Sequence, residues 1–158
     1  MSKLISLFLT VLFTYTLFAQ QDSSAKGLDE VIVTANRFPQ KQNTTGKVVT
    51  VITRSVIEKN AGRTLGELLI QQAGITIAGA NNTLGTNQDI YMRGSATGNV
   101  LILIDGIPAY DPSNIASTFD INHLALEHYE RIEILKGAQS TVYGSDAVAG
   151  VINLITKK

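Results

Sequence analysis

The side chains best suited to catalysis or metal binding in this sequence are two histidines, His123 and His128, which lie five positions apart. Histidines that hold a metal from one helix are commonly about four positions apart, because that spacing places both rings on one face. We therefore interpret both as surface or interface residues. No other cluster of potential ligands accompanies them, so the sequence predicts no metal site.

A glycine-bounded segment, Gly137–Gly144, leads into a predicted helical turn at 140–143. It lacks the lysine and the hydroxyl residue that end a phosphate-binding loop, so nucleotide binding is not expected. Ser145 lies in Tyr–Gly–Ser–Asp–Ala, which is not the Gly-x-Ser-x-Gly turn of hydrolases. A secreted enzyme is one possible functional class, and the absence of these motifs argues against it. We expect no catalytic residue and no cofactor.

The composition excludes further classes of protein. The chain has 158 residues and no cysteine, so disulfides and thiolate metal sites are ruled out. It carries 13 Lys and Arg against 13 Asp and Glu, and a formal net charge of zero gives no electrostatic reason to expect nucleic acid as a partner.

The N-terminal residues, 1–19, have the pattern of a secretory signal peptide. Lys3 supplies the positive charge, an apolar stretch follows from Leu4, and Ala19 is the small residue before a predicted cleavage site. A membrane anchor is the alternative, but a spanning helix needs about 20 mainly apolar residues and this stretch is shorter and carries hydroxyl groups. We predict export and cleavage.

Residues 20–47 are predicted to be a flexible arm. They are polar except for one short β-favouring segment, whose residues are Glu30, Val31, Ile32, Val33, Thr34 and Ala35. With polar flanks on both sides, this segment has no evident core of its own to join, and its backbone could pair with the sheet edge of another protein. The alternative is an edge strand packed on the same domain.

Residues 48–158 are predicted to form one domain of the α+β class, a small mixed β-sheet with short helices. Strands are expected at 48–53, 75–77, 88–93, 100–104, 129–136 and 150–156. The run at 100–104, VLILI, predicts a strand buried on both faces. Capping boxes are expected at Ser55 with Glu58 and at Thr64 with Glu67, each marking a helix start.

Two polar loops, 79–87 and 110–117, are longer than the turns of such a domain require. Long polar loops on a rigid sheet commonly carry binding residues, although two unconstrained solvent loops explain the pattern almost as well. The candidate ligand contacts are the amide, hydroxyl and carboxylate side chains of these loops. They are Asn81, Asn82, Thr83, Asn87, Tyr110, Asp111, Ser113 and Asn114.

Four motifs resemble, in order, those of the plug domain of TonB-dependent outer-membrane receptors. Residues 129–158, YERIEILKGAQSTVYGSDAVAGVINLITKK, are similar to the end of that domain. Upstream, YMRG at 91–94 resembles its IRG element and LIDGIP at 103–108 its LIDGVP element. The segment EVIVTANR at 30–37 is similar to the TonB box, most of all to that of cobalamin receptors.

The resemblance covers roughly residues 28–158, with two conservative departures. Ala138 replaces a usual proline and Ala149 the first glycine of a usual pair. The resemblance implies a plug lodged in a 22-stranded β-barrel of the outer membrane, and the chain stops where that barrel would begin. It also implies an arm in the periplasm.

The same resemblance implies the partners. TonB would add residues 30–35 as a strand to its own sheet. The two loops would help to bind a scarce small molecule such as cobalamin or a ferric siderophore. Arg93 and Lys136 end strands in family motifs, and we hypothesise that they pair with barrel carboxylates. The alternative is a stand-alone periplasmic binding module with the plug fold and no transport activity.

Overall fold

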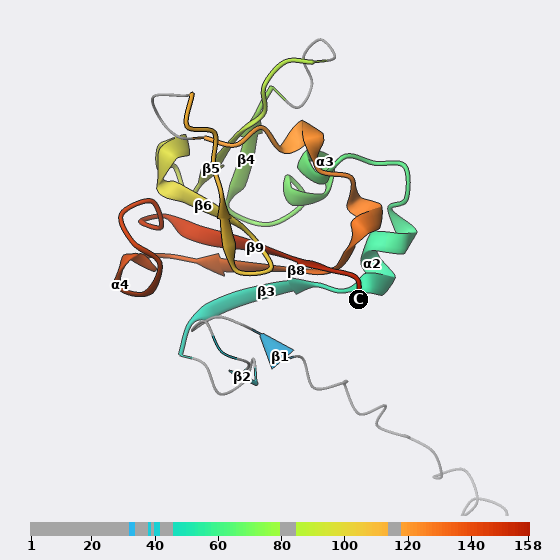
Figure 1. Cartoon of the computed structure of the whole chain (residues 1–158), viewed down its shortest axis with the longest axis horizontal. Coiled ribbons are helices and arrows are strands. Elements are labelled where there is room, and N and C mark those ends of the chain that lie inside the picture. Colours follow the sequence, from blue (N-terminus) through green and yellow to red (C-terminus); the bar gives the residue numbers. More distant parts are fainter. Residues whose placement is uncertain (1–31, 34–37, 39, 42–45, 80–84, 114–117) are drawn as a thin grey trace, which may run out of the picture.

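A mixed five-stranded sheet forms the centre of the chain in the computed structural model, which describes residues 32–33, 38, 40–41, 46–79, 85–113 and 118–158 (Figure 1). Its strand order is β3-β8-β9-β6-β7, with β6 and β9 parallel and the other pairs antiparallel. The strands are β3 (Val48–Ile52), β6 (Val100–Ile104), β7 (Ile107–Ala109), β8 (Tyr129–Lys136) and β9 (Gly150–Thr156). The predicted mixed sheet is therefore confirmed.

Pro108 lies in the edge strand β7, where its missing N–H breaks no central ladder. Two further pairs of strands stand apart from the sheet. These are β4 (Ile75–Ala78) with β5 (Asp89–Met92), and β1 (Ile32–Val33) with β2 (Gln40–Lys41).

The prediction of a single sheet was wrong for β4 and β5, which form a separate antiparallel pair. Ile75 and Ile77 alternate with exposed residues along β4, and Ile90 and Met92 alternate with half-buried residues along β5. The pair therefore has one apolar face, which it buries against the five-stranded sheet as a cover rather than as a sixth and seventh strand.

Short helices complete the same side of the sheet (Figure 1). They are α2 (Arg54–Lys59), α3 (Leu65–Leu69) and the 3-10 turns η4 (Ile121–His123) and η5 (Leu126–His128). Two more, α4 (Ser140–Tyr143) and the 3-10 turn η3 (Thr97–Asn99), lie at the ends of strands. Within the described part of the chain, no helix has the length and apolar character needed to cross a membrane.

One of the two predicted capping boxes is present. At α3 the Thr64 hydroxyl accepts a hydrogen bond from the backbone of Glu67, whose side chain accepts one from the backbone of Thr64. The other prediction was wrong, because α2 begins after Thr53 and Ser55 lies inside the helix. Glu58 instead accepts a hydrogen bond from Arg54 at 2.8 Å, one turn away.

Both faces of the central sheet carry a hydrophobic core. Ile102, Ile132 and Ile152 face the cluster beneath α2, α3 and the β4–β5 pair. Leu101 and Leu103 alternate to the other face and join a second, smaller cluster. The predicted burial of 100–104 on both faces is therefore confirmed.

Candidate functional site

The β-favouring segment at 30–35 is described only at Ile32 and Val33, and the other residues of the segment lie outside the described part of the chain. Ile32 pairs with Lys41, and Val33 pairs with Gln40, in the antiparallel β1–β2 ladder. The Val33 side chain is 0% exposed and belongs to the second hydrophobic cluster, with Leu103 and Val151.

The expectation that this segment has no core to join was therefore wrong. The second face of the sheet is apolar around Leu101, Leu135 and Val151, and a β-branched side chain can fill the space above them. In this structure Val33 occupies that position, on the face of the sheet opposite to the one that β4 and β5 cover. The described part of the segment, Ile32–Val33, is a short strand packed on its own domain, which agrees with the alternative prediction of an edge strand.

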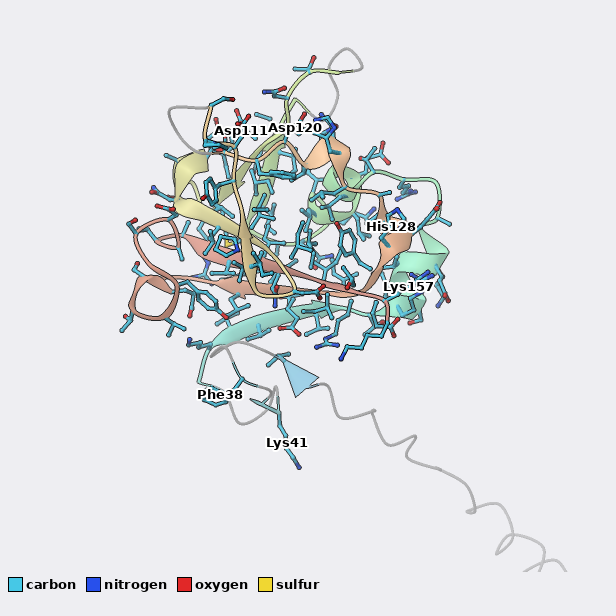
Figure 2. All side chains as sticks on the ribbon, in the orientation of Figure 1. Phe38, Lys41, Asp111, Asp120, His128 and Lys157 are labelled. Carbon is cyan, nitrogen blue, oxygen red and sulfur yellow. The ribbon has the colours of Figure 1, made fainter. Side chains whose placement is uncertain are left out.

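Four of the eight candidate loop residues are described: Asn87, Tyr110, Asp111 and Ser113. Asn81, Asn82, Thr83 and Asn114 lie outside the described residues. The described four are all exposed, and Tyr110 is 58% exposed. Figure 2 shows Asp111 at the end of the molecule farthest from Lys41, so the second loop begins opposite the β1–β2 pair.

Asp111 and Ser113 form a local turn that shapes the second loop. One carboxylate oxygen of Asp111 accepts hydrogen bonds from the backbone N–H of Ser113 at 2.9 Å and from its hydroxyl at 2.7 Å. The hydroxyl contact and then the backbone contact hold the pKa of Asp111 below its ordinary value. The second loop therefore begins with an exposed, negatively charged turn.

A pocket of about 210 Å³ lies beside the described ends of the second loop, and Ile90 of β5, Leu101 of β6, Tyr110 and Phe119 are among its lining residues. Pockets for whole small molecules commonly measure about 300–1,000 Å³. The pocket therefore has room for one substituent of a larger ligand.

Arg93 and Lys136 lie close together although 43 positions separate them in the sequence. The Lys136 ammonium donates a hydrogen bond to the Ala73 carbonyl at 2.8 Å, and the backbone N–H of Arg93 donates one to the neighbouring Gly74 carbonyl at 2.8 Å. The Arg93 guanidinium reaches Gly137, where a Cβ would lie 3.5 Å from its Nη1 atom. The two cations thus form one positively charged corner where β5 and β8 end.

Arg93 is exposed and has a φ of 53°, in the left-handed region that non-glycine residues seldom adopt. The structure therefore keeps an arginine side chain directed outward at some conformational cost. Lys136 is half-buried and already partnered by a carbonyl, so Arg93 is the more available of the two cations.

Asp105, which the sequence showed only as part of the LIDGIP motif, has a carboxylate that connects the end of β6 to β9. One oxygen accepts a hydrogen bond from the Thr156 backbone at 2.9 Å, and the other accepts one from the Thr156 hydroxyl at 2.6 Å. Burial first, and the Asp105 charge second, raise the pKa of the buried Tyr129 hydroxyl. The contact spans 51 positions, so no local pattern could have indicated it.

Strand β8 alternates charged and apolar residues, and two of its charged side chains form a salt bridge. Arg131 donates to the Glu133 carboxylate at 2.9 Å, and Glu133 is 0% exposed. A buried carboxylate needs such a partner, because an unpaired charge in the interior is strongly unfavourable. This pair is on the same face of the sheet as Val33.

Within the described ranges, no group of three or more His, Asp and Glu side chains could hold a metal ion. The His123 imidazole lies 3.8 Å from the Asp120 carboxylate, and His128 is in the next 3-10 turn. What the arrangement offers is hydrogen-bonding loops at one end and a docked strand at the other.

Comparison with known proteins gives the family. Residues 41–151 match the TonB-dependent receptor plug domain. The vitamin B12 transporter BtuB of Vibrio cholerae serotype O1 is 40% identical over 135 residues, which are 85% of this chain and 22% of that protein. The chain thus spans about a fifth of that relative's length.

Two solved structures share the fold. The siderophore receptor PirA from Acinetobacter baumannii has a TM-score of 0.55 and 32% identity, covering 70% of this chain and 17% of that one. FpvA of Pseudomonas aeruginosa, determined with bound heterologous pyoverdines, has a TM-score of 0.63 and 25% identity, covering 80% and 16%. The matched residues, 41–151, take in the strands from β3 to β8 and the first two residues of β9, and they leave β1 outside. This chain therefore belongs to the TonB-dependent receptor plug domain family.

Proposed function

We propose that this chain is the gate and ligand-sensing part of a TonB-dependent transporter in the outer membrane, with its N-terminal arm in the periplasm after export by residues 1–19. The observation that carries the proposal is the family match over residues 41–151. The barrel that such a gate needs, of 22 strands in this family, is part of the proposal.

We place the TonB-binding segment at residues 30–35. The described part of it, Ile32–Val33, is already a strand, and it pairs with Gln40–Lys41 on one edge only. Strand addition relies on main-chain hydrogen bonds, which an extended β-branched segment provides. Because Val33 is buried in the second cluster, pairing with TonB requires the segment to leave the domain, so docking and coupling compete.

Ile32→Pro tests this assignment. Proline removes a backbone donor and should abolish binding of the purified periplasmic domain of TonB, measured by calorimetry with the mature chain. Ile32→Val is the matched control, since it keeps the donor and the β-branched shape, and should bind as the parent does. Unchanged TonB binding by the proline variant contradicts the assignment.

We propose a corrinoid as the ligand and a ferric siderophore as the second candidate. The vitamin B12 transporter is 40% identical to this chain, whereas the siderophore receptor PirA is 32% identical. The loops offer amides, hydroxyls and the Asp111 carboxylate, which suit the amide groups of a corrinoid. The pocket beside Tyr110 can take one such group.

Equilibrium binding of cyanocobalamin and of ferric pyoverdine to a receptor that carries this plug separates the two ligands. Tyr110→Ala should weaken cyanocobalamin binding, while Lys59→Ala, on the far helix α2, should not. If the receptor binds ferric pyoverdine and not cyanocobalamin, a ferric siderophore replaces the corrinoid as the proposed ligand. Tight cyanocobalamin binding by the isolated chain, without any barrel, would favour the stand-alone periplasmic module instead.

We further propose that the positively charged corner of Arg93 and Lys136 faces carboxylates of the barrel wall. A cation in a lumen closed by the plug needs a partner of opposite charge. Arg93→Glu should therefore loosen the plug and raise passive leakage of a small dye through the receptor in vesicles. Lys59→Glu makes the same charge change away from the corner and should not. Equal leakage in both variants rejects the contact.

A further inference from the structure

The two candidate ligand loops are joined to each other at their bases. The Asn122 amide donates a hydrogen bond to the Thr86 carbonyl at 2.8 Å, and an Asp120 carboxylate oxygen accepts one from the backbone N–H of Gln88 at 3.3 Å. Thr86 and Gln88 lie at the end of the first loop, and Asp120 and Asn122 follow the second. We call these four residues the loop clamp.

Contacts within the turn η4 hold Asp120 and Asn122 in place. The same Asp120 oxygen accepts a hydrogen bond from the backbone N–H of Asn122 at 3.1 Å and so caps the 3-10 turn η4. Between them, Ile121 is buried in the main hydrophobic cluster. The Asp120 carboxylate thus caps the turn η4 and also binds the end of the first loop. It therefore fixes the position of η4 relative to the first loop.

The other half of the clamp is equally constrained. The Gln88 side chain is buried, and a Cβ added to Gly66 of α3 would overlap its amide oxygen. Gly66 thus leaves the space that Gln88 fills, and α3 holds the end of the first loop against the domain. The described end of each loop is thus anchored in the domain, through Gln88 for the first loop and Ile121 for the second, and Gln88 also lines the pocket beside Tyr110.

We propose that Asp120 and Asn122 are positioning residues, which hold the two loops in one relation so that they meet a ligand as a single surface. This inference rests on the proposed function for its purpose, but the clamp itself stands on the observed contacts. Loops held in their binding geometry lose less conformational entropy when a ligand binds. Neither residue needs to touch the ligand.

The distance between the loops tests the clamp without any ligand. Because the chain has no cysteine, Asn87→Cys with Ser113→Cys gives two defined spin-labelling sites, both on exposed loop residues. In the mature chain, Asp120→Ala and Asn122→Ala should each broaden the label-to-label distance distribution measured by pulsed electron resonance.

Asp120→Asn keeps an acceptor oxygen at the same place and should preserve the narrow distribution. His123→Ala is the second control, since this exposed neighbour lies 3.8 Å from Asp120 and takes no part in the clamp. If Asp120→Ala leaves the distribution unchanged, or if Asp120→Asn broadens it as much, the clamp is refuted.

A second measurement addresses the purpose of the clamp. In a receptor that carries this plug, Asp120→Ala and Asn122→Ala should weaken cyanocobalamin binding about tenfold, the effect of losing roughly one well-placed hydrogen bond. TonB binding in the absence of ligand should not change. Unaltered cyanocobalamin affinity together with broadened distances refutes the positioning role. A parent receptor that binds no cyanocobalamin refutes the ligand proposal and leaves the spin-label result to decide the clamp.

Discussion

Val33→Ala should release the N-terminal strand from the domain. Val33 is 0% exposed in the second hydrophobic cluster, and the substitution removes two methyl equivalents from that cluster. At about 0.8 kcal/mol for each buried methylene, docking should weaken by about 1.6 kcal/mol. This corresponds to a roughly fourteenfold larger population of the undocked arm.

Hydrogen–deuterium exchange of peptides spanning Ile32–Lys41 measures that population directly. When closing is faster than exchange, the rate is proportional to the open fraction, so exchange should accelerate roughly fourteenfold. Val48→Ala is the matched control, because it makes the same change at a side chain that is 58% exposed and close to the arm in sequence. The exchange rate of peptides from β9 should not change in either variant.

The reasoning is refuted if Val33→Ala and Val48→Ala accelerate exchange equally. It is also refuted if exchange in β9 rises together with that in β1, because the substitution would then weaken the whole domain rather than the docking of one strand. A larger acceleration than the estimate is compatible with the reasoning, since a residual cavity adds to the cost of losing the methyl groups.

Three further predictions follow from local contacts. Thr64→Ala removes the capping box of α3 and should lower the free energy of unfolding, measured by thermal denaturation, by about 1 kcal/mol. Thr64→Ser should lower it little. Gly150→Ala should destabilise strongly, because its Cβ would overlap a backbone carbonyl of β8 and the sulfur of a buried methionine, whereas Gly46→Ala has open space. Ser113→Ala should raise the pKa of Asp111 towards its ordinary value in an NMR titration. In the parent, the turn's stabilisation is present above the ordinary carboxyl pKa and is lost as pH falls through the lowered one.

Local patterns predicted most of the elements. The apolar run of β6 and the charged alternation of β8 each specify a strand by the period of their side chains, and the structure has both. Thr64 and Ser55 share the same spacing to a glutamate, yet only Thr64 caps a helix. Helix α2 begins at Arg54, two residues earlier than a cap at Ser55 would require, so the Ser55 hydroxyl lies inside the helix.

Contacts across the chain could not be predicted in this way. Asp105 with Thr156 and Asn122 with Thr86 depend on which strands and loops become neighbours, which is a property of the sheet order. The docking of Val33 was missed for a related reason. Its short apolar segment has polar flanks, and most of the apolar surface that receives it comes from β6, β8 and β9, which lie much later in the chain.

Strand β6 links the two ends of the proposed mechanism. Leu101 and Leu103 are on the face that receives Val33, and after one tight turn the same hairpin leads through β7 to Tyr110 and the second loop. A closely packed strand that is buried on both faces transmits displacement rather than absorbing it. A ligand that shifts the loop therefore acts on the wall of the site where the arm is docked. Because binding and release are linked free energies, a ligand that favours undocking must in turn bind more tightly to a plug whose arm TonB has already taken.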